Sequence, residues 1–276
     1  MPAWPPYTQE PIPRTELHTD RAHPARVYDC ILGGKTHFAA DRQAAAAMLQ
    51  DWPDLVTSMR ANRAFMHRVA RWLARRGLDQ FLDIGTGIPT SPNLHEVVQG
   101  TRPTARIAYL DNDPIVLAHA RALLRGTPDG HVDYLSADLR DLPGLLSDQE
   151  RRQLFDWSRP LAVLALAVLQ FVTDNDARTL LHALVQEIPS RSYLAVSLPT
   201  ADTAGSAAEH VADRYAAAGI PVVMRTAAEV ADLLVSSGLD LAPPGVALVH
   251  RWHPELGTSL EADTTVAMYG AVAIKP

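Results

Sequence analysis

Short apolar strands alternate with helical segments over most of this chain, and this alternation restricts the fold more than any other feature. From Gln80 onward, runs of aliphatic and aromatic residues are separated by stretches whose apolar residues recur every three or four positions. The pattern is typical of parallel βαβ units. It predicts five parallel strands near residues 80–84, 105–110, 132–136, 161–168 and 192–198.

The expected connections change towards the C-terminal end. Two further strand candidates, near 245–250 and 266–274, are joined by a polar loop rather than a helix. A parallel return needs a crossover of about a dozen residues or more, usually helical, so these two strands should pair antiparallel. Helices are expected elsewhere near residues 92–99, 114–125, 142–154, 175–187, 205–218 and 226–237.

The expected fold class is α/β: a doubly wound, Rossmann-like sheet of seven mostly parallel strands, with an antiparallel terminal hairpin and an N-terminal helical lid. Helices are predicted at Ala39–Leu49 and Thr57–Arg75, where Ala, Arg, Met and Leu dominate. Residues 1–24 contain six prolines and should be an extended arm. We expect one compact unit, with the arm and lid in 1–76 and the sheet domain in 77–276.

Composition limits the functions open to the chain. The 276 residues are 47% hydrophobic, which excludes a disordered protein. The net charge of −6 gives no general attraction to nucleic acid or to an anionic membrane, so neither partner is expected. The one cysteine, Cys30, forms no internal disulfide, which favours a reducing compartment. We therefore expect a cytoplasmic protein, whose oligomeric state the sequence leaves open.

Neither a membrane span nor a metal site is expected. The most apolar run, Leu161–Val172, has twelve residues, whereas a membrane helix needs about 20. The segment Val249–Pro254 contains two histidines but no acidic partner at a metal-binding spacing. The sequence therefore predicts no bound metal.

The first strand ends in a motif that points to a ligand. In the run FLDIGTG, Gly85 and Gly87 follow the strand and flank Thr86. Glycine permits a sharp turn and lets a ligand approach without a Cβ in the way, and open α/β sheets bind ligands at this edge. Ser91 should cap the next helix. A plain strand-to-helix turn would use the same glycines, so the pair alone does not name the ligand.

Acidic residues at three strand ends narrow the range of ligands that the site could bind. Asp83 precedes the glycines, Asp111 ends the second strand and Asp138 ends the third. An acid after the second strand can accept both ribose hydroxyls of an adenosine. Asp138 can accept a hydrogen bond from the adenine amino group while Leu139 lies against the ring. The dinucleotide fingerprint would need a third glycine where the chain has Thr90, which disfavours a nicotinamide oxidoreductase.

Two of the acids also have purely structural explanations. Asp111 could serve simply as a carboxylate that interacts with the dipole of the following helix. Asp138 could serve simply to begin a turn with Arg140 and Asp141 nearby. We expect Asp111 at an exposed strand end, so its replacement by alanine should weaken cofactor binding and change the stability of the fold little.

The motifs FLDIGTG, YLDNDPIVLAHAR and SADLRDL resemble the successive cofactor motifs of class I S-adenosylmethionine-dependent methyltransferases. With RVYDCILGGKTHFAADR they also resemble an actinobacterial group of methyltransferase-like proteins of unknown function, over Arg26–Lys275. The resemblance implies S-adenosylmethionine as cofactor and a methyltransferase domain over 77–276. It implies nothing about the methyl acceptor.

By this resemblance the glycine loop would hold the methionine part of the cofactor, with the preceding acid near its amino group. The second strand end would bind the ribose and the third the adenine, while the region after the fourth strand, Ala167–Phe171, would face the sulfonium and the acceptor. That region reads AVLQFV and lacks the Asn-Pro-Pro-Tyr type motif with which several methyltransferases bind a planar amino group, which argues against base or glutamine N-methylation of that kind. The implied cofactor contacts are Asp83, Gly85, Thr86, Gly87, Asp111, Asn112, Asp138, Leu139 and Ala167.

The segment Tyr28–Phe38 crowds polar residues around a Gly-Gly turn. We interpret it as a lid that closes over the cofactor and lines the acceptor pocket; an ordinary loop before the first helix is the alternative. Tyr28 and His37 are the candidate catalytic residues, for substrate contact or proton transfer. Arg60, Asn62 and Arg63 on the following helix are further candidates for the pocket, although arginines on a helix more often form a solvated face.

The sequence therefore favours an S-adenosylmethionine-dependent methyltransferase that acts on a small molecule. Methyl transfer depends on alignment and exclusion of water more than on a base, so no catalytic dyad needs to be visible. The second hypothesis is a regulator with the same fold and cofactor but no turnover.

Overall fold

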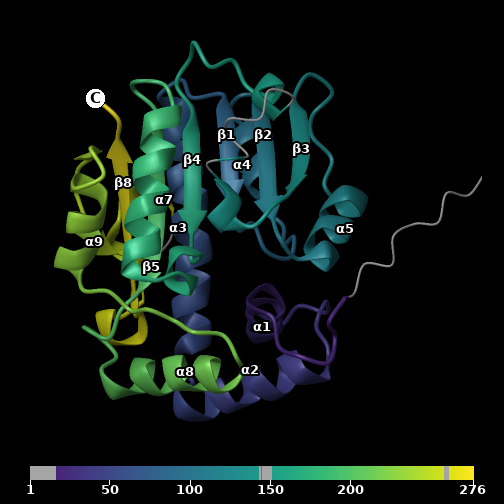
Figure 1. Ribbon diagram of the computed structural model, residues 1–276, viewed down its shortest axis with the longest axis vertical. Coiled ribbons are helices and arrows are strands. Elements are labelled where there is room, and N and C mark those ends of the chain that lie inside the picture. Colours follow the sequence, from purple (N-terminus) through teal and green to yellow (C-terminus); the bar gives the residue numbers. More distant parts are fainter. Residues whose placement is uncertain (1–16, 143, 145–150, 258–260) are drawn as a thin grey trace, which may run out of the picture.

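The computed structural model of the chain confirms the α/β fold class. It describes residues 17–142, 144, 151–257 and 261–276. A central sheet carries helices on both faces, and a further group of helices lies beyond the carboxyl ends of the parallel strands (Figure 1).

Five strands pair in parallel in the order β3-β2-β1-β4-β5, close to the predicted positions. The chain order reverses between the adjacent strands β1 and β4, and open α/β sheets bind ligands outside the carboxyl ends of strands at such a point. The five strands are β1 (Gln80–Ile84), β2 (Arg106–Asp111), β3 (His131–Ser136), β4 (Ala162–Leu166) and β5 (Tyr193–Pro199).

The predicted antiparallel edge is present, with one more strand than expected. β8 (Met268–Ile274) pairs antiparallel with β5, and its other edge pairs with two short strands, β6 (Asp240–Leu241) and β7 (Ala247–Leu248). The described sheet therefore has eight strands rather than seven. Between β6 and β7 stand Pro243 and Pro244, which have no N–H to donate to a ladder, so pairing along this edge is interrupted.

Helices cover the sheet on both faces because the strand residues alternate in direction. Leu82 and Ile84 pack on one face against α7 (Asp174–Glu187) and α9 (Ala227–Val235). Phe81 and its neighbours pack on the opposite face against α3, α4 and α5. These three helices span Leu55–Arg75, Leu94–Gln99 and Pro114–Leu123.

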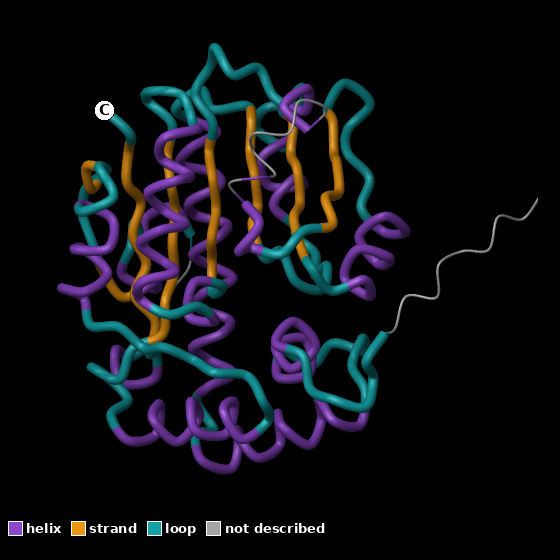
Figure 2. The backbone as a smooth tube through the Cα atoms, viewed as in Figure 1, coloured by secondary structure: helices purple, strands orange, loops and turns teal. Residues whose placement is uncertain are grey.

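A third apolar cluster lies beyond the strand ends, where α1, α2 and α8 meet (Figure 2). α2 (Ala39–Asp51) and α8 (Ser206–Ala217) agree with the predicted helices. α1 (Pro24–Ile31) was not predicted, and it carries Tyr28, which the sequence analysis placed in a loop or lid segment. Val27 and Ile31 of α1 are buried in this cluster, so tertiary packing stabilises the short helix.

Two predicted segments, the N-terminal arm and a helix in the middle of the chain, fall partly outside the described residues. Of the expected arm, residues 1–16 are not described. Of the expected helix at 142–154, residues 143 and 145–150 are not described, and Arg151–Leu154 forms a short 3-10 helix rather than an α-helix.

A buried arginine joins α1 to the rest of the molecule. Arg26 is 1% exposed, and its Nε lies 3.3 Å from an Asp41 oxygen and 3.9 Å from an Asp113 oxygen. Its remaining nitrogens donate to backbone carbonyls, including that of Arg21. Since Asp41 belongs to α2 and Asp113 caps α5, one cation ties the N-terminal helices to the sheet domain.

The substitution Arg26→Met should destabilise the fold strongly, because it leaves two buried carboxylates without their cation. We expect a loss of about 3–5 kcal/mol in the free energy of unfolding, measured by urea denaturation at neutral pH. The matched control is Arg214→Met, which removes the exposed ion pair with Asp51 and should shift the midpoint little. Equal midpoints for both variants would contradict this role of Arg26.

Candidate functional site

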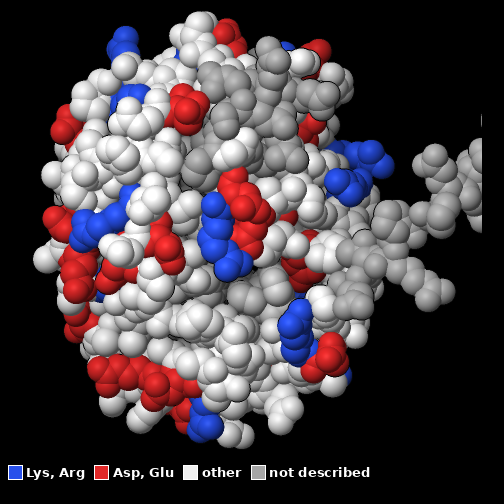
Figure 3. Space-filling view, in the orientation of Figure 1, with Lys and Arg blue, Asp and Glu red and all other residues white. Residues whose placement is uncertain are grey.

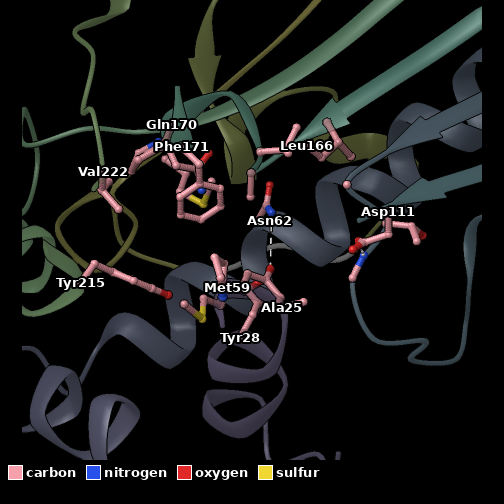
Figure 4. Close-up of a pocket in the computed structure, with 18 of the residues that line it drawn as sticks. Ala25, Tyr28, Met59, Asn62, Asp111, Leu166, Gln170, Phe171, Tyr215 and Val222 are labelled. Atoms are coloured by element: carbon pink, nitrogen blue, oxygen red, sulfur yellow. Dashed lines mark hydrogen bonds between the residues drawn. The ribbon is translucent and has the colours of Figure 1, made fainter. Parts of the chain in front are cut away.

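A cavity of about 540 Å³ opens at the carboxyl edge of the parallel strands. Its walls come from the loop after β1, from the ends of β2, β3 and β4, and from α1, α3 and α8 (Figure 4). Segments far apart in sequence therefore converge on one hollow of the size that small-molecule sites have.

Almost all of the predicted site residues line this cavity, so the three strand-end aspartates face one space. His37 is the exception: its backbone carbonyl accepts a hydrogen bond from Arg42, and its side chain is not among those that face the cavity. The lining residues from the predicted set are Tyr28, Asp83, Gly85, Thr86, Gly87, Asp111, Asn112, Asp138, Leu139 and Ala167.

The glycine loop has the backbone form that its sequence predicts. Gly85 and Gly87 adopt φ angles of +69° and +68°, in a backbone region that residues other than glycine rarely adopt. A Cβ on Gly87 would meet nothing within 4 Å, so this glycine borders open space. A Cβ on Gly85 would lie 2.5 Å from Val168, so this glycine is needed for packing against the turn after β4.

The start of α4 differs from the prediction. The helix begins at Leu94, and Asn93 rather than Ser91 is its N-cap. The backbone N–H of Asn93 donates to the Glu96 carboxylate, and the Ser91 hydroxyl donates to the same carboxylate. The longer loop is held by Arg63, which donates to the carbonyls of Thr90 and Pro92.

Asp111 is more deeply buried than the sequence analysis expected. It is 5% exposed, and its two oxygens accept the backbone N–H groups of Gly87 and Asp113, each at 2.9 Å. Burial raises the pKa of its carboxyl above the ordinary value. The expectation of an exposed strand end is wrong. Because the carboxylate organises the backbone on both sides, we now expect Asp111→Ala to lower the stability of the fold.

Asp138 performs the turn role that the sequence left open. Its carboxylate caps the turn Leu139–Asp141 and forms a two-pronged ion pair with Arg140, at 2.8 Å and 2.6 Å. Asn112 donates to the same carboxylate at 3.3 Å. Hydrogen bonding from Arg140 lowers the pKa of Asp138 to about 2.

Asp83 lies beneath the glycine loop with few charged neighbours. Its carboxylate accepts a hydrogen bond from the Thr86 hydroxyl at 2.9 Å. Burial raises the pKa of Asp83 to about 6, and the bond from Thr86 offsets only part of this effect. An ionised Asp83 is therefore poorly solvated, and a cationic group placed beside it would stabilise the charge.

Tyr28 reaches the cavity from α1 and is held in place by α3. Its hydroxyl donates to the carbonyl of Met59 at 3.0 Å and accepts a hydrogen bond from the Asn62 side chain at 3.4 Å. Burial raises the pKa of Tyr28 above its ordinary value. The hydroxyl therefore keeps its proton near neutral pH and directs it to a backbone carbonyl.

Sequence reasoning missed part of the apolar wall. Met59, Tyr215 and Val222 line the cavity beside Phe171 (Figure 4). No local signal marks Tyr215 or Val222, because their approach depends on the path of the chain after β5. Met59 stands one helical turn before Arg63, so the cavity-facing side of α3 was partly visible in the sequence.

Comparison with known protein families agrees with this geometry. A model described as S-adenosyl methyltransferase matches residues 10–276. The chain belongs to the S-adenosyl methyltransferase family. Its cofactor is S-adenosylmethionine. Among curated proteins, none matches the chain.

Solved structures include two close relatives of this S-adenosyl methyltransferase family member. A protein of the DUF574 family from Streptomyces avermitilis is 45% identical, with a TM-score of 0.88 over 95% of this chain and 100% of its own. A proposed methyltransferase from Thermobifida fusca is 32% identical, with a TM-score of 0.84 over 95% and 98% of the two chains. Both agree with the actinobacterial resemblance.

A more distant structure shares the fold alone. Magnesium protoporphyrin IX methyltransferase from Synechocystis, with bound S-adenosylhomocysteine, is 13% identical and has a TM-score of 0.54 over 91% of this chain and 93% of its own. Within the described part of this chain, none of the helices has the length and hydropathy of a membrane span.

The raised pKa of Asp83 predicts a pH-dependent stability. The unfolded chain releases this proton near the ordinary value of 3.8 and the folded chain only near 6, so folded-state stability falls as the pH rises between them. The variant Asp83→Asn lacks this penalty. Relative to the wild type, it should gain about 2 kcal/mol between pH 4 and pH 6.5.

This gain is measured by urea denaturation of both proteins across that pH range, each time as the difference in the free energy of unfolding. If the difference between the two proteins were the same at every pH, Asp83 would titrate normally in the folded chain.

Proposed function

We propose that this protein is an enzyme that transfers a methyl group from S-adenosylmethionine to a small organic acceptor. The observation that supports this most strongly is the continuity of one cavity. Its sheet end carries the glycine loop and three aspartates, and its helical end carries apolar and aromatic side chains. Such a cavity can hold the cofactor and an acceptor side by side.

The residues of the sheet end fit the cofactor. The open space at Gly87 suits the close approach of its methionine part to the loop from Gly85. Asp83 would lie near the cationic amino group, which would stabilise its poorly solvated charge. Asp111 would accept the ribose hydroxyls, with Asn112 beside it.

The adenine end would involve Asp138 and Leu139. The Asp138 carboxylate already accepts hydrogen bonds from Arg140 and Asn112. The Arg140 side chain is 70% exposed, so it can turn into solvent at little cost and free the carboxylate for the adenine amino group. We propose that Arg140 makes this movement when the cofactor binds.

The helical end supplies positioning and exclusion of water. When bound, the cofactor supplies an electrophilic methyl group on its sulfonium. Ala167, after β4, would face that group, while Tyr28 and Met59 close the cavity from α1 and α3. We propose that the helices of the N-terminal region, residues 17–76, act as the lid and that 77–276 form the methyltransferase domain. Alignment of the acceptor and exclusion of water are the contributions this reaction needs.

A small-molecule acceptor is favoured over nucleic acid. The acceptor end of the cavity lies among buried apolar side chains from α1, α3 and α8. On the face in Figure 3, Lys and Arg side chains lie singly or beside Asp and Glu rather than forming a continuous basic surface. Nucleic-acid binding depends on such a surface because phosphate contacts dominate its affinity.

The proposal is tested with S-adenosylmethionine that carries a labelled methyl group. The purified protein is incubated with it and with a fractionated metabolite extract, and labelled small molecules are detected by mass spectrometry. An enzyme yields a labelled product that is absent with heat-denatured protein. Tight binding of the cofactor without any labelled product across the fractions would favour the regulator instead.

The ribose role of Asp111 predicts a specific loss of affinity. In Asp111→Asn the charge is gone and an amide N–H group faces backbone N–H donors, so S-adenosylhomocysteine should bind about 10- to 100-fold more weakly. The measurement is isothermal titration calorimetry, and the matched control is Asp133→Asn on the neighbouring strand, whose carboxylate pairs with His131 at the surface. An unchanged dissociation constant for Asp111→Asn would refute the ribose role.

A further inference from the structure

Two buried amide oxygens in the acceptor end of the cavity have no hydrogen-bond partner. They are Oδ1 of Asn62 and Oε1 of Gln170, on side chains that are 5% and 8% exposed. Both residues line the cavity. A buried carbonyl oxygen without a donor is costly, so each oxygen is explained if a ligand supplies an N–H or O–H group to it.

The orientation of Asn62 follows from its neighbours. The Tyr28 hydroxyl gives its hydrogen to the Met59 carbonyl, so it can only accept from Asn62. The Asn62 amide nitrogen must therefore face Tyr28, which leaves the oxygen pointing away from it. In Figure 4 the Asn62 side chain rises from Tyr28 towards the region between Phe171 and Leu166.

Gln170 supplies the second oxygen from the opposite wall. It lies in the 3-10 turn Leu169–Phe171, which follows β4, and its backbone carbonyl is already bonded to the N–H of Val223. This turn is part of the AVLQFV segment, which lacks the Asn-Pro-Pro-Tyr motif but brings an amide oxygen to the same cavity.

The surroundings of the two oxygens are apolar and aromatic. Met59, Phe171, Tyr215 and Val222 stand around them (Figure 4). The ring centroids of Phe171 and Tyr215 are 6.4 Å apart in an edge-on arrangement. Such walls suit a flat hydrocarbon body that carries few polar groups.

The two tyrosine hydroxyls at this end are not bases. Burial raises the pKa of both Tyr28 and Tyr215, so both hydroxyls stay protonated near neutral pH. Neither hydroxyl can take the proton that a phenol must lose before it reacts.

Charge disfavours two further acceptor types. A carboxylate would gain nothing from the Asn62 oxygen, which can only accept hydrogen bonds. An alkylammonium group would need a carboxylate partner, and the neighbours of Asn62 and Gln170 that Figure 4 labels, Met59, Leu166, Phe171, Tyr215 and Val222, carry none. An aromatic amine is neutral near pH 7, donates N–H hydrogens and keeps a nucleophilic lone pair.

We infer that the methyl acceptor is a flat aromatic amine whose N–H group is bound by Asn62 Oδ1, with Gln170 Oε1 as a second acceptor. This inference rests on the proposed function. The amine nitrogen uses its lone pair to form the new C–N bond, and the electron pair of the broken C–S bond remains on sulfur. The methylated nitrogen then releases its extra proton to solvent.

The test compares three probes of similar shape on protein saturated with S-adenosylhomocysteine: 1-aminonaphthalene, 1-naphthol and 1-methylnaphthalene. Dissociation constants are measured by calorimetry. The amine should bind about tenfold more tightly than the methyl compound, because its two N–H hydrogens can satisfy both unpartnered oxygens. It should also bind more tightly than the naphthol, which has a single O–H hydrogen for the two oxygens. Equal affinities, or a preference for the naphthol, would overturn the inference.

Two variants assign the preference to the named oxygens. Asn62→Leu and Gln170→Met remove one amide each with little change in size, and each should reduce the preference for the amine over the methyl compound to about threefold. The matched control Asn175→Leu alters an exposed amide on α7 and should keep the full preference. If both cavity variants kept it too, the oxygens would not be the binding groups.

The affinity for S-adenosylhomocysteine separates this inference from the proposed function. The three variants should bind it as the wild type does, which also shows that they are folded. Failure of the wild type to bind it would overturn the proposed function and the inference together. Normal binding with no preference among the probes would overturn the inference alone.

Discussion

The carboxylate of Asp111 is the contact on which the rest of the site depends. It accepts one backbone N–H from Gly87 and one from Asp113, so it fixes the glycine loop against the end of β2 and the start of α5. Its pKa is raised by burial, yet its position in the cavity leaves it able to meet hydroxyl donors. The same group thus shapes the loop and offers the charge that an adenosine ribose would bind.

A second contact connects the N-terminal helices to this loop. Arg26 lies between Asp41 of α2 and Asp113, the residue whose backbone N–H binds Asp111. The buried cation therefore connects the N-terminal helices with the cofactor loop through a short chain of bonds. Since α1 also carries Tyr28, which helps to orient Asn62, the position of the acceptor end is coupled to that of the cofactor end.

Periodicity was sufficient to predict the parallel strands and most helices, because each depends on its own apolar pattern. The edge strands were harder, since Pro243 and Pro244 interrupt pairing in a way that only the partner strand reveals. The residues that the motifs predicted to bind the cofactor all line the cavity. The burial of Asp111 could not be predicted in this way, because it depends on backbone donors from two other segments. No sequence signal marks Tyr215 as a cavity residue. His37 was predicted to contact the substrate, but the fold does not bring it to the cavity.

The central proposal is that one molecule of S-adenosylmethionine lies along the glycine loop and the three strand-end aspartates, with its ribose at Asp111 and its adenine at Asp138. A crystal structure of the complex with S-adenosylhomocysteine tests it most directly. We predict both ribose hydroxyls within hydrogen-bonding distance of Asp111 and the adenine amino group at Asp138, with Arg140 turned away. A ligand whose ribose lies far from Asp111, or one bound in another part of the molecule, would contradict it.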